Sequence, residues 1–159
     1  MLSITLITLG TLKEDYLRAG VAEYLRRLST YAQVSEINLP EEKIANEDDP
    51  SAVARALERE GDAILSKIPK GAITVALCVE GKELSSPELA AFISRAGESS
   101  GKLVFIIGSS HGLSPRVKAA AGLRLSVSRM TFPHQLMRLL LAEALYRAAT
   151  INAGKKYHK

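Results

Sequence analysis

The chain has 159 residues, which is the length of one domain (residues 1–159), and 47% of them are hydrophobic, too many for a disordered protein. No apolar run approaches the roughly 18–20 residues that crossing a membrane needs, so we expect no membrane span. The net charge is +4, but residues 1–111 hold 12 Lys/Arg against 16 Asp/Glu, whereas residues 112–159 hold nine against one. This basic C-terminal third is typical of a protein with a polyanionic partner, most simply a nucleic acid; the alternative is a solvated tail that improves solubility.

The N-terminal segment and the cysteine content bear on where the protein works. Residues 1–10 lack the basic start and the small-residue cleavage site of a signal peptide, and they are predicted to form a strand. Cys78 is the only cysteine, which excludes an internal disulfide and a multi-thiolate metal site. The three histidines lack zinc spacing, and the acidic segment Pro40–Pro50 lacks the spacing of calcium ligands. We therefore expect a cytoplasmic protein without a metal, in which Pro40–Pro50 is a solvated loop.

Apolar alternation and apolar helical spacing take turns along the chain. In chain order, the sequence predicts a strand at 2–9, a helix at 17–29, a strand at 34–39, a helix around 53–65, a strand at 73–79, a helix at 86–97, a strand at 103–107, a short helix from 115, a strand at 123–127 and a long helix at 133–153. Two of the helices begin with a serine cap and a proline, Ser86-Pro87 and Ser114-Pro115. Five strands alternating with five helices favour an α/β domain with a mainly parallel sheet.

Ligands of such sheets bind beyond the carboxyl ends of the strands, which directs attention to the loops Glu80–Ser85, Gly108–Ser114 and Ser128–Phe132. Neither the dinucleotide fingerprint nor the phosphate-binding loop motif occurs in the chain. We expect the turns near residues 77, 108 and 130 to converge on one cavity, covered by the basic C-terminus.

One of these loops also fits a hydrolase motif. Residues 108–112 match Gly-x-Ser-x-Gly, with Ser110 as the nucleophile, and Glu143 and His158 follow in the acid-then-histidine order. A nucleophile elbow starts its helix directly after the serine, which would put Pro115 inside the helix, where its ring collides with a carbonyl. A serine hydrolase is therefore an alternative and not the favoured interpretation.

Several segments resemble one family closely. They are Phe105–Gly108 with Gly112–Ser114, Met130–Arg138, Glu143–Ala148 and Tyr157–Lys159, and the Pro-His-Gln-Leu-Met-Arg helix start and the Tyr-His-Lys ending are the most specific parts. The chain resembles the ribosomal large-subunit methyltransferase H family, which belongs to the SPOUT class, and the resemblance covers essentially its full length.

The resemblance implies a SPOUT-type α/β fold with a deep C-terminal trefoil knot and a five- to six-stranded, mainly parallel sheet with helices on both faces. It also implies a homodimer that uses S-adenosyl-L-methionine. The implied reaction is methylation of N3 of a pseudouridine in helix 69 of 23S rRNA, on the large subunit or the 70S ribosome. A non-catalytic ribosome-binding assembly factor with the same basic tail is the remaining alternative.

The resemblance also assigns site residues. The cofactor contacts it implies are Leu77, Gly108, Ser128, Arg129, Met130, Thr131, Phe132 and Pro133. The substrate RNA contacts are Arg129, Lys155, Lys156, Tyr157, His158 and Lys159. The catalytic candidates are His134, His158 and Arg138, because N3–H must lose its proton and a nearby acceptor or cation assists that step. His134 has an alternative role as a cap of the last helix, and Tyr157 has one in packing against the partner subunit.

The chain departs from the family pattern at Ser109, where a glycine is usual, and at His111, where a small or acidic residue is usual. If position 109 needs a positive φ, Ser109 costs roughly 1 kcal/mol or more of strain. His111 is expected to be a solvent-exposed loop histidine, with contact to the target base as the alternative.

Overall fold

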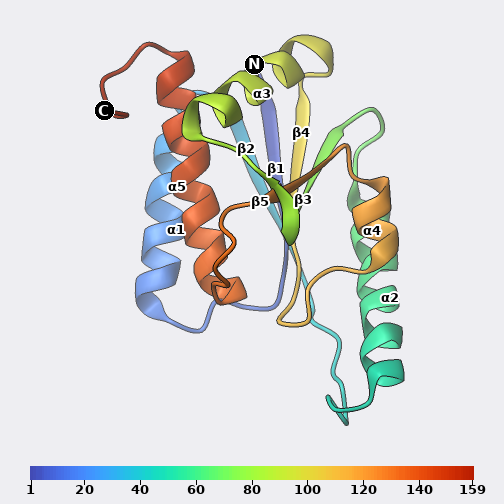
Figure 1. Cartoon of the computed structure of the whole chain (residues 1–159). Coiled ribbons are helices and arrows are strands. Elements are labelled where there is room, and N and C mark those ends of the chain that lie inside the picture. Colours follow the sequence, from blue (N-terminus) through green and yellow to red (C-terminus); the bar gives the residue numbers. More distant parts are fainter.

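The computed structural model describes residues 1–159 and contains five strands that alternate with five helices (Figure 1). The elements are β1 (Ser3–Leu9), α1 (Asp15–Leu28), β2 (Gln33–Leu39), α2 (Pro50–Lys67), β3 (Ile73–Glu83), α3 (Ser86–Ser99), β4 (Lys102–Ile107), α4 (Pro115–Ala120), β5 (Leu123–Ser126) and α5 (His134–Asn152). This order confirms the alternation that the apolar pattern predicted.

The five strands form one sheet in the order β2-β1-β4-β3-β5, and every neighbouring pair is parallel. All carboxyl ends therefore point to the same edge of the sheet, which lies at the bottom of Figure 1. The central strand β4 is almost wholly buried, as its continuous run of β-branched and aromatic residues requires.

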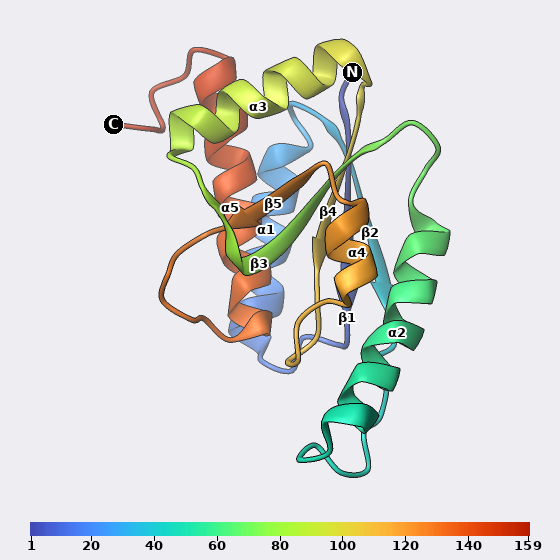
Figure 2. The ribbon, with the colours of Figure 1, turned by 45° about the vertical axis from the view of Figure 1, so that its right-hand side comes forward.

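Helices cover both faces of the sheet (Figures 1 and 2). Helices α1, α3 and α5 pack on one face around a core that includes the fully buried Leu28, Phe105 and Leu141. Helices α2 and α4 pack on the other face over a smaller core that includes Ile7 and Ile64. Helices on both faces are the arrangement expected for an all-parallel sheet, because burial of both faces is what such strands need.

Serine caps begin both helices that the sequence predicts from a Ser-Pro pair, but the cap of α3 is Ser85 and not the predicted Ser86. The hydroxyl of Ser85 accepts from the backbone N–H of Glu88, whose carboxylate accepts from the Ser85 N–H in return, so a capping box starts α3. The Ser114 hydroxyl accepts from the N–H of Val117 and caps α4, with Pro115 in the first turn. Local cap chemistry therefore fixes where these helices start.

Strand β3 is longer than predicted and includes residues that the sequence assigned to the loop Glu80–Ser85. After a register shift between Leu77 and Lys82, β3 pairs with β5 again, with Lys82 opposite Leu125. Gly81 makes this possible, because a Cβ there would lie 2.7 Å from the Leu125 carbonyl carbon. No helix of the structure combines the length and the apolar character that spanning a bilayer requires.

Candidate active site

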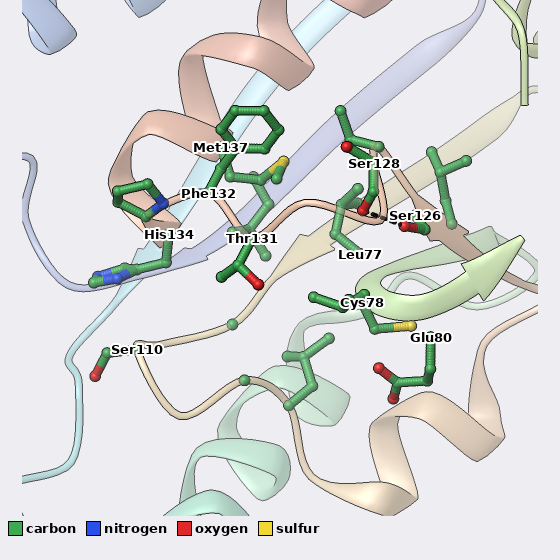
Figure 3. A pocket seen from close by; sticks show the side chains of 18 of the residues that line it. Leu77, Cys78, Glu80, Ser110, Ser126, Ser128, Thr131, Phe132, His134 and Met137 are labelled. Carbon is green, nitrogen blue, oxygen red and sulfur yellow. Dashed lines mark hydrogen bonds between the residues drawn. The ribbon is translucent and has the colours of Figure 1, made fainter. Parts of the chain in front are cut away.

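A cavity of about 680 Å³ lies at the carboxyl edge of the sheet, and three segments that are distant in sequence line it. These segments are residues 77–80 at β3, 107–113 after β4, and 125–128 with 130–134 between β5 and α5. Figure 3 shows His134 and Ser110 at one end of the cavity and Cys78 and Glu80 at the other. The volume falls within the roughly 300–1,000 Å³ of small-molecule sites, as expected for a site at the strand ends.

Most of the expected cofactor residues line this cavity. The lining residues from that set are Leu77, Gly108, Ser128, Met130, Thr131, Phe132 and Pro133. Arg129 is not among them, because its side chain is 91% exposed and its only ionic neighbour is Glu83 at 3.7 Å. Arg129 was expected to contact both the cofactor and the RNA. Its exposed side chain is available for the RNA contact.

The turn after β4 is closed by its own backbone. A Cβ on Gly108 would lie 2.3 Å from the Gly112 carbonyl oxygen, so only glycine fits at that position. Gly112 has a φ of +87° and donates its N–H to the Ser109 carbonyl at 2.9 Å. No residue other than glycine has a positive φ, so the condition under which Ser109 would be strained is not met.

The three polar side chains of this turn all meet carboxylates. The buried Ser109 hydroxyl donates to Glu60 at 3.1 Å, and the exposed Ser110 hydroxyl donates to Glu41 at 3.4 Å. His111 Nε2 lies 3.3 Å from a Glu47 oxygen. His111 is thus a half-buried, paired residue that lines the cavity, and not the solvent-exposed histidine that the sequence suggested.

The segment between β5 and α5 is held by serine side chains. Ser126 donates its hydroxyl to the Ser128 carbonyl at 2.9 Å, and the Ser128 hydroxyl accepts from the Met130 N–H at 3.0 Å (Figure 3). Pro133 stands at the N-cap position of α5, and no side chain caps the helix. The capping interpretation of His134 is therefore wrong, and its imidazole lines the cavity.

The cavity lining contains one charged pair, Glu80 and Lys118, and two histidines, His111 and His134. Lys118 donates to a Glu80 carboxylate oxygen at 2.5 Å, and this hydrogen bond holds the pKa of Glu80 below its ordinary value. Leucine, valine, isoleucine, methionine and phenylalanine side chains supply most of the remaining surface, together with backbone groups of the turns. The cavity therefore suits a largely apolar ligand with a polar or zwitterionic end.

Arg138 lies outside the cavity, on the second turn of α5. It is 93% buried (7% exposed), one of its terminal nitrogens donates to the Gly10 carbonyl at 2.9 Å, and its Nε has no partner. Burial lowers the pKa of the Arg138 guanidinium from its ordinary value. Its contacts attach α5 to the end of β1, and they involve none of the residues that line the cavity.

A second polar cluster lies along the C-terminal half of α5 and includes the C-terminal tail. Arg147 donates two hydrogen bonds to Glu143 (2.6 and 3.0 Å) and a third to His158 Nδ1 at 3.3 Å. Tyr157 donates to the same Glu143 oxygen at 3.1 Å and packs edge-on against Tyr146. Hydrogen bonding with Tyr24 in the first place, then burial and Glu143, raises the pKa of Tyr157 to about 12, so the phenol keeps its proton at neutral pH.

The tail therefore does not cover the cavity of its own chain. No residue beyond Met137 lines the cavity, and the C-terminus lies beside the C-terminal half of α5, away from the end of the helix where His134 lies (Figure 1). Lys155, Lys156 and Lys159 are exposed and form no ion pair. We predicted no joint role for Glu143 and Arg147, although their i, i+4 spacing on a predicted helix is a signal for such a pair.

The hydrolase alternative fails on geometry. Ser110 lies in the turn, five residues before α4 begins at Pro115, and its hydroxyl faces Glu41. Glu143 and His158 are both bound to Arg147 in the cluster at the other end of α5. The three members of the expected triad are not assembled.

The fold and cavity define a class: parallel α/β proteins that bind a small ligand in turns at the carboxyl edge of the sheet. Residues 2–158 match the family model described as "Predicted SPOUT methyltransferase". Proteins named ribosomal RNA large subunit methyltransferase H from Carboxydothermus hydrogenoformans and Bacillus thuringiensis (strain Al Hakam) are each 46% identical over 99% of this chain and 100% of their own length. The chain belongs to the SPOUT methyltransferase family, within its ribosomal RNA large subunit methyltransferase H branch.

Solved structures of low sequence identity share the fold. A probable methylase family protein from Haemophilus influenzae Rd KW20 superposes with a TM-score of 0.53 at 13% identity, covering 99% of this chain and 70% of that protein. A probable methyltransferase from Bordetella pertussis Tohama I gives a TM-score of 0.53 at 16% identity, with coverage of 92% and 95%.

Proposed function

We propose that this protein transfers the methyl group of S-adenosyl-L-methionine to N3 of a pseudouridine in helix 69 of 23S rRNA, on the large subunit or the 70S ribosome. The observation that carries the proposal is the single cavity formed by residues 77–80, 107–113 and 125–134, in a chain 46% identical over its full length to proteins named for this kind of activity. A ribosomal RNA substrate also favours a cytoplasmic location for the protein.

The cavity fits the proposed cofactor in size and chemistry. An adenine and a thioether are mostly apolar, and Leu77, Phe132 and Met137 offer apolar surface for them. Turn backbone near Gly108 and residues 128–133 supplies hydrogen-bonding groups that can hold the purine edge and ribose. The Glu80–Lys118 pair offers both signs of charge to a zwitterionic amino-acid end.

The chemistry divides between the cofactor and the protein. The bound sulfonium supplies an electrophilic methyl group, and the protein must align the attacking nitrogen behind it and receive the N3 proton. His134, at the first residue of α5 and on the cavity lining, is the group we propose as the proton acceptor. Arg138, which is bound to the Gly10 carbonyl outside the lining, then positions α5 and with it His134.

We propose that the tail acts on the site of a partner subunit in a homodimer. Tyr157 and His158 bond to Glu143 and Arg147, which lie nine and 13 residues after His134, or about 14 and 20 Å along α5, so the tail does not reach His134 of the same chain. Partly exposed apolar residues on α5, among them Leu136, Leu140 and Ala144, offer a surface for a second copy. A partner arranged antiparallel along α5 would bring its Tyr157, His158 and lysines to the cavity, where they would bind the RNA.

The knotted C-terminal end is also a proposal. The chain leaves α4 on one face of the sheet, passes through β5 at the edge and continues as α5 on the other face (Figures 1 and 2). This crossing, together with membership of the SPOUT family, supports a knot formed by the segment after β5.

The decisive experiment is mass spectrometry of rRNA nucleosides from cells that lack this protein, before and after the gene is restored. We expect N3-methylpseudouridine to disappear and to return with the active protein. An unchanged nucleoside profile would contradict the proposal. Ribosome binding without any affinity for S-adenosylmethionine in calorimetry would favour a non-catalytic assembly factor instead.

A further inference from the structure

We infer that Glu60 and Ser109 form a buried clamp that positions the 108–112 turn for cofactor binding, and this inference rests on the proposed function. Glu60 lies on α2, outside the cavity, and is 4% exposed. One of its carboxylate oxygens accepts from the Ser109 hydroxyl at 3.1 Å, and the other accepts from the Glu42 backbone N–H at 2.9 Å. Glu60 is therefore a positioning residue that acts through the turn.

The cost of burying a carboxylate indicates why this contact matters. A buried carboxylate is unfavourable unless hydrogen bonds satisfy it, and Glu60 has two such bonds and no cationic partner. Burial raises the pKa of Glu60, and the hydrogen bonds from Glu42 and Ser109 oppose that change. A displacement of the turn away from α2 would leave one oxygen buried and unpaired, so the carboxylate resists that displacement.

The next residue on α2 holds the other end of the same turn. A Cβ on Gly61 would lie 2.6 Å from the Ser114 hydroxyl, so the absence of a side chain lets Ser114 pack directly against the helix. Ser114 in turn caps α4 through the Val117 N–H. Glu60 and Gly61 thus fix the start and the end of the turn against one element.

The turn held in this way also forms part of the cavity wall, from Ile107 to Leu113. Gly108 and Gly112 both line the cavity and are in close backbone contact with one another. A turn that is already in place binds its ligand without first losing conformational freedom, which is the general basis of preorganisation. The contacts of Ser110 with Glu41 and His111 with Glu47 join the same turn to the acidic segment before α2, but they are exposed and contribute less.

The test compares Ser109→Ala, Glu60→Ala and Glu60→Gln with the wild-type protein. A glutamine can accept from the Glu42 N–H through its carbonyl and donate to the Ser109 hydroxyl through its amide, so Glu60→Gln preserves both contacts. Ser66→Ala is the matched control, because Ser66 lies on the same helix and its hydroxyl bonds only to the Ala63 carbonyl. All variants are measured well below their melting temperatures.

Two measurements are made: the affinity for S-adenosylhomocysteine by calorimetry, and hydrogen exchange of residues 108–114 in the free protein. We expect Ser109→Ala to bind about tenfold more weakly and to exchange faster in the turn, with the central strands unchanged. Glu60→Ala should show the same or a larger effect, while Glu60→Gln and Ser66→Ala should resemble wild type. If Glu60→Ala does not fold, Ser109→Ala and Glu60→Gln still decide the question.

The failures of the two proposals are distinguishable. Wild-type protein that binds no S-adenosylhomocysteine would overturn the proposed function and this inference with it. Wild-type binding that Ser109→Ala leaves unchanged, in affinity and in turn exchange, would overturn the inference alone. A Glu60→Gln variant as weak as Glu60→Ala would also overturn it, because the hydrogen bonds would then not be what positions the turn.

Discussion

The wall of the cavity requires a residue without a side chain at position 108. In Gly108→Ala the new Cβ would lie 2.3 Å from the Gly112 carbonyl oxygen and 2.5 Å from its carbon, so the backbone of the turn must move. We expect the affinity for S-adenosylhomocysteine, measured by calorimetry, to fall by about tenfold or more. Gly122→Ala is the control, because its nearest neighbour would be the Thr74 carbonyl at 3.5 Å, an ordinary contact. Equal affinity in both variants would contradict this account of the turn.

Single residues differ in how far the sequence could predict them. Gly108 follows a predicted buried strand and carries a family motif, so its place beside the cavity could be anticipated. The contact between Ser109 and Glu60 could not, because 49 residues separate them and only the packing of α2 against the turn joins them. The family pattern indicated strain at Ser109 only if the turn needs a positive φ there; the φ is not positive, and the Ser109 hydroxyl bonds to Glu60.

Gly81 controls how strand β3 ends. A Cβ at this position would lie 2.7–2.8 Å from backbone atoms of Arg124 and Leu125 in β5, so Gly81→Ala must push the two strands apart beyond the bulge. We expect the free energy of unfolding in urea to fall by about 1–3 kcal/mol, as for other overpacked sites.

The matched control for Gly81→Ala is a glycine inside a helix. Gly97 lies in α3, and a Cβ there would approach nothing closer than Leu2 Cδ1 at 3.8 Å. Because alanine is the better helix former, Gly97→Ala should raise the free energy of unfolding by up to about 1 kcal/mol. If Gly81→Ala proves as stable as Gly97→Ala, the close approach of β3 and β5 is not as described.

The elements were predicted well where their signals are local and poorly where they are not. The Ser-Pro pairs predicted the starts of α3 and α4 to within one residue, because the cap and the proline act within one turn; the cap of α3 is Ser85 in place of the predicted Ser86. The end of β3 was missed because the polar residues after Val79 do not form a buried strand pattern. Their pairing depends on Leu125, which lies more than 40 residues later in the chain.

The charge asymmetry of the chain has a consequence for the molecule as a whole. The exposed Lys155, Lys156 and Lys159 have no ion-pair partner, and the Arg129 side chain is 91% exposed. If these groups contact RNA phosphates, binding releases counterions, so log affinity should fall linearly with log salt concentration. Filter binding to ribosomes between about 50 and 200 mM salt measures the slope, and replacing Lys155 and Lys156 with alanine should make it shallower. A slope near zero for the wild-type protein would contradict a phosphate-binding tail.

The tail lies away from the cavity of its own chain, so the active site that we propose needs two chains. If the tail of one subunit completes the cavity of the other, two different inactive variants can restore each other. Gly108→Arg fills the space beside the turn, and deletion of Tyr157–Lys159 removes the groups proposed to bind RNA. In a mixed dimer, the cavity of the tail-deleted subunit would receive the intact tail of the Gly108→Arg subunit.

We therefore expect each variant to be inactive alone and an equal mixture, after subunit exchange, to recover methyl transfer to ribosomes. Random pairing makes half of the dimers mixed, each with one of its two sites intact, so activity should reach about a quarter of the wild-type value. The tail deletion should retain nearly full affinity for S-adenosylhomocysteine, because no residue beyond Met137 lines the cavity. Mixtures that form mixed dimers, verified by native mass spectrometry, yet stay inactive would show that the tail does not act across the dimer.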